Sequence, residues 1–153
     1  MQNILDPCCG SKMFYFDKND PRVMFCDCRE LETSLCDGRT LMVKPDMIVD
    51  FRDLPFADGQ FPLVVFDPPH LVRAGENSWM RKKYGKLPKV GWKEYLAQGF
   101  NECWRVLSAK GTMVFKWNED QITIGNIEDI FPTKPIMGTR TNAKTMFIVF
   151  FKE

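Results

Sequence analysis

The 153-residue chain has a single histidine, almost no net charge and no long apolar run. The formal net charge is +1, so the protein as a whole does not attract polyanions or polycations strongly. No apolar segment approaches the roughly 20 residues that a membrane-spanning helix needs, so we expect no membrane association. The first residues, Met1 to Asp6, lack the basic and apolar regions of a signal peptide. A cytoplasmic location is therefore the default expectation.

The six cysteines lack a diagnostic spacing. Cys8 and Cys9 are adjacent, Cys26 and Cys28 are separated by one residue, and no pair has the C-x-x-C spacing of a structural zinc site. Disulfides are rare in the cytosol, so we favour reduced thiols that pack as small hydrophobic side chains. We therefore predict no metal site.

What the chain does have is the composition of a folded globular domain. Hydrophobic residues make up 44% of it and aromatic residues 13%, well above the level typical of disordered segments. The length suits one domain and leaves no room for a second of ordinary size. We predict a single domain over residues 1–153.

Five short apolar runs are predicted to be strands. They are Ile4–Leu5, Val23–Cys26, Met47–Val49, Pro62–Phe66 and Gly111–Trp117. The runs are continuous rather than alternating, which is typical of a parallel sheet covered on both faces. At the C-terminus, Ile136–Thr139 and Thr145–Phe151 predict an antiparallel hairpin.

Helices are expected between these runs. The best candidate spans Lys93 to Leu107, because Leu96, Phe100, Cys103 and Leu107 fall on one apolar stripe. Shorter helices are expected from Met13 to Phe16 and from Arg29 to Cys36.

Three of the early strands are followed by a carboxylate. Asp27, Asp50 and Asp67 each end an apolar run. Because the carboxyl ends of parallel strands share one edge of the sheet, these residues are expected at the edge where ligands bind. Carboxylates also end strands simply as turn formers, but three in succession favour a ligand site.

Three segments resemble motifs of the class I S-adenosylmethionine-dependent methyltransferases. Leu5-Asp6-Pro7-Cys8-Cys9-Gly10-Ser11 is similar to the first motif, especially in the amino-methylating branch. The segment 50–61, with Leu-Pro-Phe and Asp-Gly, looks like the third-strand region. Asp67-Pro68-Pro69-His70 resembles the Asp/Asn-Pro-Pro-aromatic tetrapeptide of enzymes that methylate exocyclic or amide nitrogen. The order and spacing fit over residues 4–117, most closely those of small stand-alone bacterial or phage nucleic-acid methyltransferases.

The resemblance implies a Rossmann-like α/β fold, with a mostly parallel seven-stranded sheet, helices on both faces and an antiparallel C-terminal hairpin. It implies S-adenosylmethionine as cofactor and S-adenosylhomocysteine as product. The cofactor-binding residues it implies are Asp6, Pro7, Cys8, Cys9, Gly10, Ser11, Asp27, Asp50 and Phe51. Segment 6–11 would line the methionine part, Asp27 would accept hydrogen bonds from the ribose hydroxyls, and Asp50 with Phe51 would meet the adenine.

The sequence departs from the family pattern at two places. Lys12 stands where a second glycine is usual, which puts a cation beside the site of a sulfonium cofactor. The helix that precedes the first strand in many relatives is expected to be absent or replaced.

The resemblance implies that Asp67, Pro68, Pro69 and His70 are catalytic. An exocyclic amino group is a poor nucleophile because its lone pair is delocalised into the ring. The Asp67 carboxylate and the Pro68 carbonyl would each accept one N–H and so favour rehybridisation in the transition state. His70 departs from the relatives, which usually have Tyr, Phe or Trp stacked on the target base at this position; a histidine can stack too, although a lone histidine is more commonly a satisfied loop or core residue.

Residues 71–93 are basic on an otherwise acidic chain. They carry seven Lys or Arg and one Glu, a net +6, which leaves −5 for the remainder. Cations contact phosphates and aromatic rings stack on bases, so we expect this loop to meet a nucleic acid; the alternative is a solvated surface loop. The predicted substrate-binding residues are Arg73, Trp79, Arg81, Lys82, Lys83, Tyr84, Lys116 and Asn118.

The expected function is methylation of an amino nitrogen, with adenine N6 of a nucleic acid favoured over cytosine. A separate target-recognition domain does not fit in the chain, so target specificity would require a protein partner or a homo-oligomer. Two alternatives stay open. One is methylation of a protein side chain or a small molecule, and the other is a non-catalytic cofactor-binding partner subunit, which the departures at Lys12 and His70 would suit.

Overall fold

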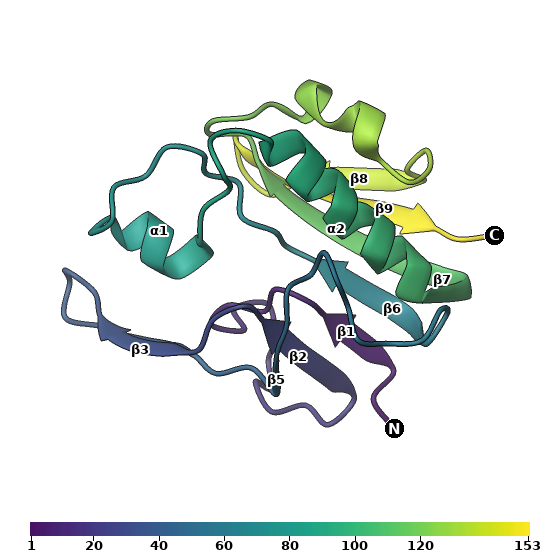
Figure 1. Cartoon of the computed structure of the whole chain (residues 1–153), viewed down its shortest axis with the longest axis horizontal. Coiled ribbons are helices and arrows are strands. Elements are labelled where there is room, and N and C mark those ends of the chain that lie inside the picture. The colour runs from purple at the N-terminus through teal and green to yellow at the C-terminus, as the bar shows by residue number, and fades with distance from the viewer.

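The computed structural model describes residues 1–153 and contains a seven-stranded mixed sheet (Figure 1). The order across the sheet is β5-β2-β1-β6-β7-β9-β8. The strands are β1 (Ile4–Asp6), β2 (Val23–Asp27), β5 (Met47–Ile48), β6 (Phe61–Phe66), β7 (Leu107–Asn118), β8 (Met137–Arg140) and β9 (Thr145–Phe151). β9 runs antiparallel to both of its neighbours, and the other pairs are parallel. The predicted mixed sheet and C-terminal hairpin are confirmed.

The chain builds the sheet outward in two directions from β1. β2 and β5 extend it on one side, whereas β6 and β7 extend it on the other. The strand order therefore reverses between β1 and β6. In open α/β sheets, a crevice forms at such a switch point, outside the carboxyl ends of the strands.

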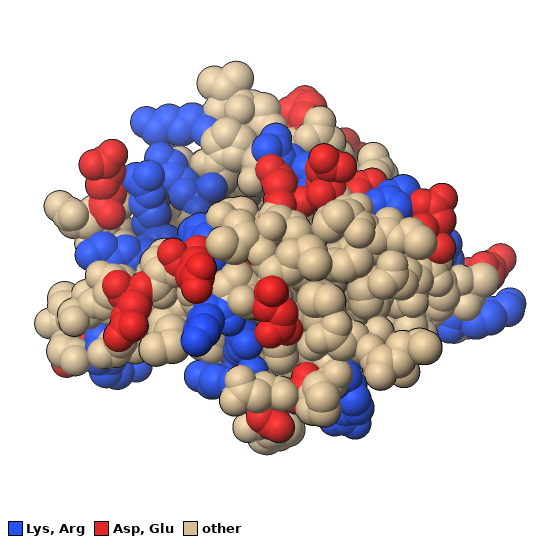
Figure 2. Space-filling view, turned by 60° about the horizontal axis from the view of Figure 1, so that its bottom comes forward, with Lys and Arg blue, Asp and Glu red and all other residues tan.

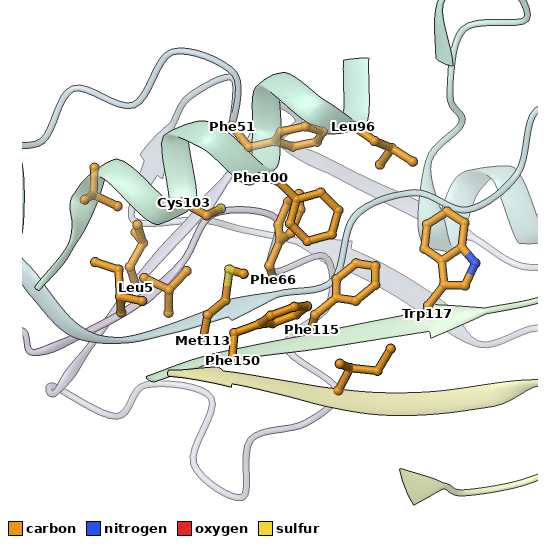
Figure 3. Packing of buried hydrophobic residues seen from close by; sticks show 14 of the residues in the cluster. Leu5, Phe51, Phe66, Leu96, Phe100, Cys103, Met113, Phe115, Trp117 and Phe150 are labelled. Atoms are coloured by element: carbon orange, nitrogen blue, oxygen red, sulfur yellow. The ribbon is translucent and has the colours of Figure 1, made fainter. Parts of the chain in front are cut away.

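One face of the sheet carries the main hydrophobic core. Helix α2 (Trp92–Val106) crosses β6 and β7 and buries the predicted apolar stripe, including Leu96, Phe100 and Cys103. Figure 3 shows these side chains interleaved with aromatic rings from β6, β7 and β9. The 3₁₀ turns η1 (Ile124–Asn126) and η2 (Glu128–Ile130) close the same side, because Phe131 packs edge-on against Phe100 at a centroid distance of 5.4 Å. The predicted helix and the burial of Leu96, Phe100 and Cys103 are confirmed, whereas Leu107, predicted as the last residue of the stripe, begins β7.

The opposite face carries no helix. Near the carboxyl ends of the strands, the loop 7–22 covers it, and the Tyr15 ring packs 4.7 Å from Phe25. The short helix expected from Met13 to Phe16 is wrong; turns occupy this stretch. Isolated turn hydrogen bonds hold the loop instead, from the Lys12 N–H to the Cys9 carbonyl at 2.8 Å and from the Tyr15 N–H to the Lys12 carbonyl at 3.4 Å. Helices therefore lie over one face of the sheet rather than both.

The helix expected from Arg29 to Cys36 is also wrong. That segment forms β3 (Leu31–Ser34), which pairs with β4 (Thr40–Val43) in a separate two-stranded hairpin. Buried and exposed residues alternate along β4, and Asp37-Gly38 supplies a strong hairpin-turn signal. The hairpin projects beside helix α1 (Trp79–Tyr84), which itself stands away from the sheet (Figure 1).

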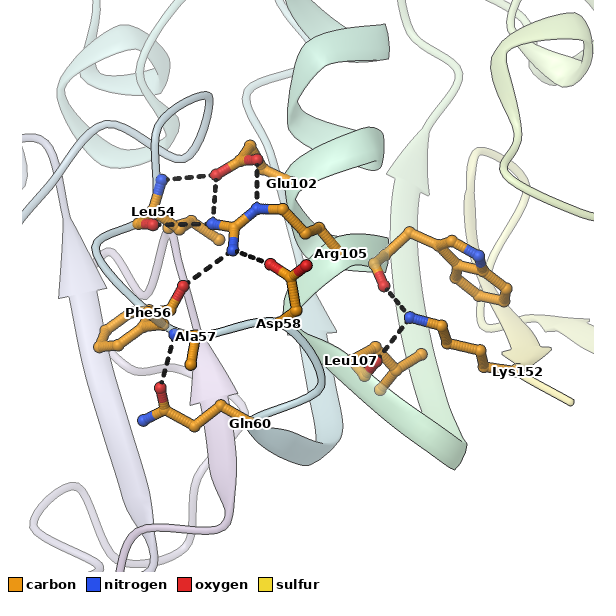
Figure 4. A network of polar contacts seen from close by, with 10 residues as sticks. Leu54, Phe56, Ala57, Asp58, Gln60, Glu102, Arg105, Leu107 and Lys152 are labelled. Carbon is orange, nitrogen blue, oxygen red and sulfur yellow. Dashed lines mark hydrogen bonds and ion pairs between the residues drawn. The ribbon is translucent and has the colours of Figure 1, made fainter.

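Arg105 fastens the loop before β6 to helix α2 (Figure 4). Its Nη1 donates to the Phe56 carbonyl at 2.8 Å and its Nη2 donates to the Leu54 carbonyl at 2.9 Å. Glu102 holds the other edge of the guanidinium, at 2.7 Å from Nε. The planar fork of arginine can satisfy all of these acceptors together.

Arg105→Leu is expected to destabilise the protein by about 2 kcal/mol, because two loop carbonyls lose their donor. At this chain length the melting temperature should fall by about 4–8 °C, measured by thermal denaturation. Arg105→Lys is the matched control. It keeps the charge but not the fork, so it should recover less than half of the loss. Full recovery by lysine would show that charge alone holds this loop.

No helix in the structure combines the length and the apolar character needed to span a bilayer.

Candidate active site

A cleft opens at the carboxyl ends of β1, β2 and β6, at the switch point of the sheet. Residues from all three predicted motif segments line it. The predicted residues on its walls are Asp6, Cys8, Cys9, Gly10, Ser11, Asp27, Phe51, Asp67, Pro68, Pro69, Lys83, Tyr84 and Lys116. The cleft therefore joins residues that are up to 110 positions apart in the sequence.

Other predicted residues lie outside the cleft walls. They are Pro7, Asp50, His70, Arg73, Trp79, Arg81, Lys82 and Asn118. Asp50 holds Arg52 in an ion pair of 2.6 Å, and the Arg52 guanidinium lies 4.2 Å above the Tyr95 ring, which does line the cleft. Asn118 is engaged with the hydroxyl of Thr145 at 3.0 Å.

Asp27 ties the two sides of the cleft together. Its carboxylate accepts the Gly10 N–H at 2.9 Å and the Arg29 Nε–H at 3.2 Å. Arg29 in turn donates from Nη1 to the Lys82 carbonyl at 3.0 Å. Arg29 was not predicted from the sequence. Its position two residues after Asp27, the carboxylate that ends β2, could have indicated that the two side chains pair. Through this chain of contacts, helix α1 is fastened over the carboxyl-end edge of the sheet.

The turn after α1 passes close to the cleft floor at Gly85. This residue has φ 75°, and a Cβ there would lie 3.2 Å from Cγ of Pro69. Only glycine combines this backbone with so close an approach. The basic segment therefore reaches the Asp67-Pro68-Pro69 turn directly.

Asp6 is a buried carboxyl, 1% exposed. It accepts the Tyr15 hydroxyl at 2.9 Å and the Cys8 N–H at 3.2 Å. Burial raises its pKa to about 8, although the Tyr15 hydrogen bond opposes that shift, and the nearby Asp67 carboxylate adds to it. A cleft that crowds carboxyl groups in this way favours a positively charged ligand beside Asp6.

Asp67 directly follows β6 and faces Lys116 on the neighbouring strand β7. The Lys116 Nζ lies 3.4 Å from Oδ2 of Asp67 and 4.7 Å from the centre of the Phe14 ring. Burial raises the pKa of Asp67 to about 6, and Lys116 acts in the opposite direction. At neutral pH the Asp67 carboxylate is thus ionised and able to accept hydrogen bonds.

His70 is buried behind Tyr84, with 5% of its surface exposed. Its ring centroid is 5.4 Å from that of Tyr84 and 6.3 Å from that of Trp117. Its Nε2 has no hydrogen-bond partner, and burial, followed by the charge of Lys116, lowers its pKa to about 4. His70 is therefore neutral at physiological pH, and the aromatic ring on the cleft wall next to the turn is Tyr84.

Lys12 points away from the cleft. Its Nζ lies 4.2 Å from the centre of the Phe25 ring and donates to the Lys18 carbonyl at 3.1 Å. The departure from the family pattern at this position therefore puts no cation inside the cleft. Nowhere in residues 1–153 do three His, Cys, Asp or Glu side chains gather as a metal-binding group.

Searches against known proteins give similarity in structure alone. No protein-family model matches the chain, and no curated protein matches its sequence. The fold is similar to that of the PH0226 protein from Pyrococcus horikoshii, with a TM-score of 0.62 and 14% identity over 98% of this chain and 81% of that one. It is also similar to a SAM-dependent methyltransferase from Methanosarcina mazei, with a TM-score of 0.56 and 13% identity over 99% and 94%. These similarities establish the fold.

Proposed function

We propose that the chain is an S-adenosylmethionine-dependent methyltransferase that acts on an amino nitrogen, with the exocyclic amino group of a nucleic-acid base, adenine N6 above all, as the acceptor. One observation carries the proposal. Asp6, Asp27 and Asp67, which end three neighbouring strands, line a single cleft at the switch point of the sheet. The named methyltransferase from Methanosarcina mazei, which has the same fold, supports the cofactor class.

The residues of the cleft fit this cofactor. S-adenosylmethionine carries a sulfonium, an ammonium, two ribose hydroxyls and a flat adenine. Asp6 and Asp27 provide carboxylates for the cations and hydroxyls, and the rings of Phe51 and Tyr95 provide flat walls for the adenine. The two rings stand edge to face at 5.2 Å. The cofactor, when bound, supplies a methyl group activated on sulfur.

Asp67 and the two prolines position the acceptor. The carboxylate of Asp67 and the carbonyl of Pro68 accept the two N–H bonds of the amino group, which directs the nitrogen lone pair toward the methyl carbon. The bound cofactor would supply the methyl group for the new N–C bond and would be released as S-adenosylhomocysteine. The nitrogen then gives one proton to the Asp67 carboxylate, which passes it to solvent. A pKa of about 6 for Asp67 suits both the accepting and the releasing state.

A nucleic-acid acceptor is supported by unpaired cations. Six of the eight arginines form ion pairs within the protein. The two that do not, Arg73 and Arg81, both lie in the segment 71–93. Of the lysines in that segment, only Lys93 has a carboxylate partner. Figure 2 shows Lys and Arg gathered over the upper left of the molecule, where α1 lies, with a few Asp and Glu among them, whereas the centre of this face is uncharged.

Calorimetry with S-adenosylhomocysteine tests the cofactor assignment. The wild type should bind, and Asp27→Ala should bind at least about tenfold more weakly, since the loss of a hydrogen bond to a charged group costs about 1.5–3 kcal/mol. Asp50→Ala is the informative comparison, because its carboxylate is held by Arg52 outside the cleft. Equal weakening by both variants would support the expected adenine contact of Asp50. A folded wild type without binding would overturn the assignment.

Transfer of a labelled methyl group tests the acceptor class. We expect label in single-stranded DNA or RNA, removable by nuclease. Charge reversal at Arg81, Lys82 and Lys83 should reduce this transfer strongly and flatten its salt dependence. Transfer that survives nuclease treatment and tolerates the charge reversal would instead support a protein side chain or a small molecule.

Cofactor binding should release protons at pH 7. Asp6, with a pKa of about 8, is largely protonated in the free protein at that pH. A cation beside it favours the ionised form, so binding should tighten as the pH rises from 6.5 to 8. Calorimetry in phosphate and in Tris buffer should give different apparent enthalpies, and Asp6→Asn should remove the difference. Identical enthalpies in the two buffers for the wild type would contradict the titration of Asp6.

A further inference from the structure

We propose that the groove between the β3–β4 hairpin and helix α1 is a second base-binding subsite, in which Trp79 stacks on a nucleobase that neighbours the one in the cleft. The inference rests on the proposed nucleic-acid acceptor and deepens it. The subsite implies a single-stranded acceptor, because a base can stack on Trp79 only when it is not stacked and paired within a duplex.

The groove joins two segments that lie 40 or more positions apart in the sequence. Its walls are Ser34, Leu35 and Cys36 at the hairpin end and Asn77, Ser78, Trp79 and Lys82 at the start of α1. Hydroxyl and amide groups on the walls can donate to and accept from the edge of any base. The two walls therefore combine one aromatic surface with adaptable polar groups.

Trp79 is an unusual residue to leave in solvent. It is 43% exposed, although tryptophan is normally among the most buried residues on average. By contrast, Trp117 is 1% exposed and uses its indole N–H to donate to the Ile122 carbonyl. An accessible indole face next to cations is the arrangement with which proteins bind the bases of a single strand.

The charge around Trp79 suits a phosphate backbone. Arg81, Lys82 and Lys83 follow it directly, and none of them has an acidic partner in the protein. The Lys83 Nζ lies 5.8 Å from the centre of the Trp79 ring. Within residues 71–93 the only acid is Glu76. These cations can therefore neutralise phosphates on either side of a stacked base.

The groove and the cleft lie close together, on either side of helix α1. Lys82 lines the groove, whereas the next two residues, Lys83 and Tyr84, line the cleft. The whole helix has six residues, about 9 Å at 1.5 Å per residue, a span that neighbouring nucleotides of an extended strand can cover. The Arg29 contact to the Lys82 carbonyl, at 3.0 Å, fixes α1 against the cofactor edge. The two subsites therefore hold a defined spacing.

The test is the binding of labelled single-stranded oligonucleotides, followed by fluorescence anisotropy. Short oligodeoxyadenylate and oligoriboadenylate of equal length are titrated with the wild type, Trp79→Ala, Trp79→Phe and Phe16→Ala. Trp79→Ala should weaken binding by roughly 5- to 100-fold, the cost of one stacked base. Trp79→Phe keeps an aromatic face and should recover most of the affinity. Phe16 is a fully exposed aromatic residue that lines neither groove nor cleft, so its variant should bind like the wild type.

Calorimetry with S-adenosylhomocysteine on the same variants separates the possible failures. Unchanged cofactor affinity in Trp79→Ala shows that the variant is folded and that the loss is confined to the oligonucleotide. Equal oligonucleotide affinity in the wild type and Trp79→Ala would overturn the subsite and leave the proposed function standing. A wild type that binds the cofactor product but neither oligonucleotide would overturn the subsite together with the nucleic-acid acceptor, but not the methyltransferase assignment. A preference for one of the two strands identifies the acceptor as DNA or RNA.

Discussion

Asp67→Ala should lower methyl transfer to a single-stranded adenine acceptor by roughly 10³-fold, while the affinity for S-adenosylhomocysteine changes by less than about threefold. The expected loss is the size observed when one preorganised partner of a developing charge is removed from an active site, about 10²–10³ in rate. In the proposed reaction the carboxylate of Asp67 acts on the acceptor nitrogen, so its removal should affect the transfer step more than cofactor binding. Single-turnover transfer of a labelled methyl group and calorimetry measure the two quantities separately.

Asp67→Asn is the matched control for charge. Its amide oxygen still accepts an N–H bond but cannot be protonated, so transfer should fall less than in the alanine variant. The pH profile separates the two roles of the wild-type carboxylate. Since the pKa of Asp67 is raised to about 6, the carboxylate is present above that pH, and transfer by the wild type should decline as the pH falls through 6. The asparagine variant should lack this acid limb.

Lys116 gives an independent check on the same carboxylate. It lies 3.4 Å from Asp67 and lowers the pKa of that carboxyl. Lys116→Met should therefore move the acid limb of the wild-type profile to higher pH. If the pH profile of Asp67→Asn keeps the acid limb, a group other than Asp67 causes the decline in transfer. The same conclusion follows if the acid limb of Lys116→Met stays at the wild-type pH.

The sequence predicts the ligand edge because its determinants are local. Asp27, Asp50 and Asp67 each end a short apolar run, and the parallel sheet brings the ends of such runs to one edge. Asp27 and Asp67 line the cleft there together with Asp6, whereas Asp50 lies outside its walls. Between β5 and β6 the chain crosses back to the other side of β1, which makes β1 and β6 neighbours and opens the cleft between them. Helix α2 was equally predictable, since an apolar stripe with Leu96 and Phe100 specifies one buried face.

Features that depend on distant contacts could not be predicted in this way. The segment Arg29–Cys36 has enough helix-compatible residues to suggest a helix, but it becomes a strand because β4, nine residues on, pairs with it. His70 directly follows the Asp67-Pro68-Pro69 turn in sequence, yet Tyr84 from α1 covers it. The role of Arg29 in holding helix α1 at the cleft also depends on the fold, because its hydrogen-bond partner, the Lys82 carbonyl, is 53 residues away in the sequence.

Gly99 connects the core to the cleft, and its replacement should affect both. It lies within α2, where glycine costs roughly 1 kcal/mol relative to alanine, so its presence requires a reason. A Cβ at this position would lie 2.6 Å from two atoms of the Phe51 ring and 2.9 Å from Cζ of Phe66. The rings of Phe51 and Phe66 are themselves packed edge to face at 5.4 Å. No side chain can enter without displacing Phe51, which forms one wall of the cleft.

Gly99→Leu should therefore destabilise the protein by about 3 kcal/mol, the upper range for an overpacked core, and lower the melting temperature by about 6–12 °C. In the fraction that folds, a displaced Phe51 should weaken S-adenosylhomocysteine binding by about tenfold or more, since the adenine loses its stacking partner. Gln98→Leu, an exposed substitution on the preceding residue of the same helix, is the control and should change neither quantity. A Gly99→Leu protein as stable as the wild type would contradict the close contact between α2 and the Phe51 ring. If Gly99→Leu is destabilised but binds S-adenosylhomocysteine with unchanged affinity, Phe51 packs in the core and does not contact the cofactor.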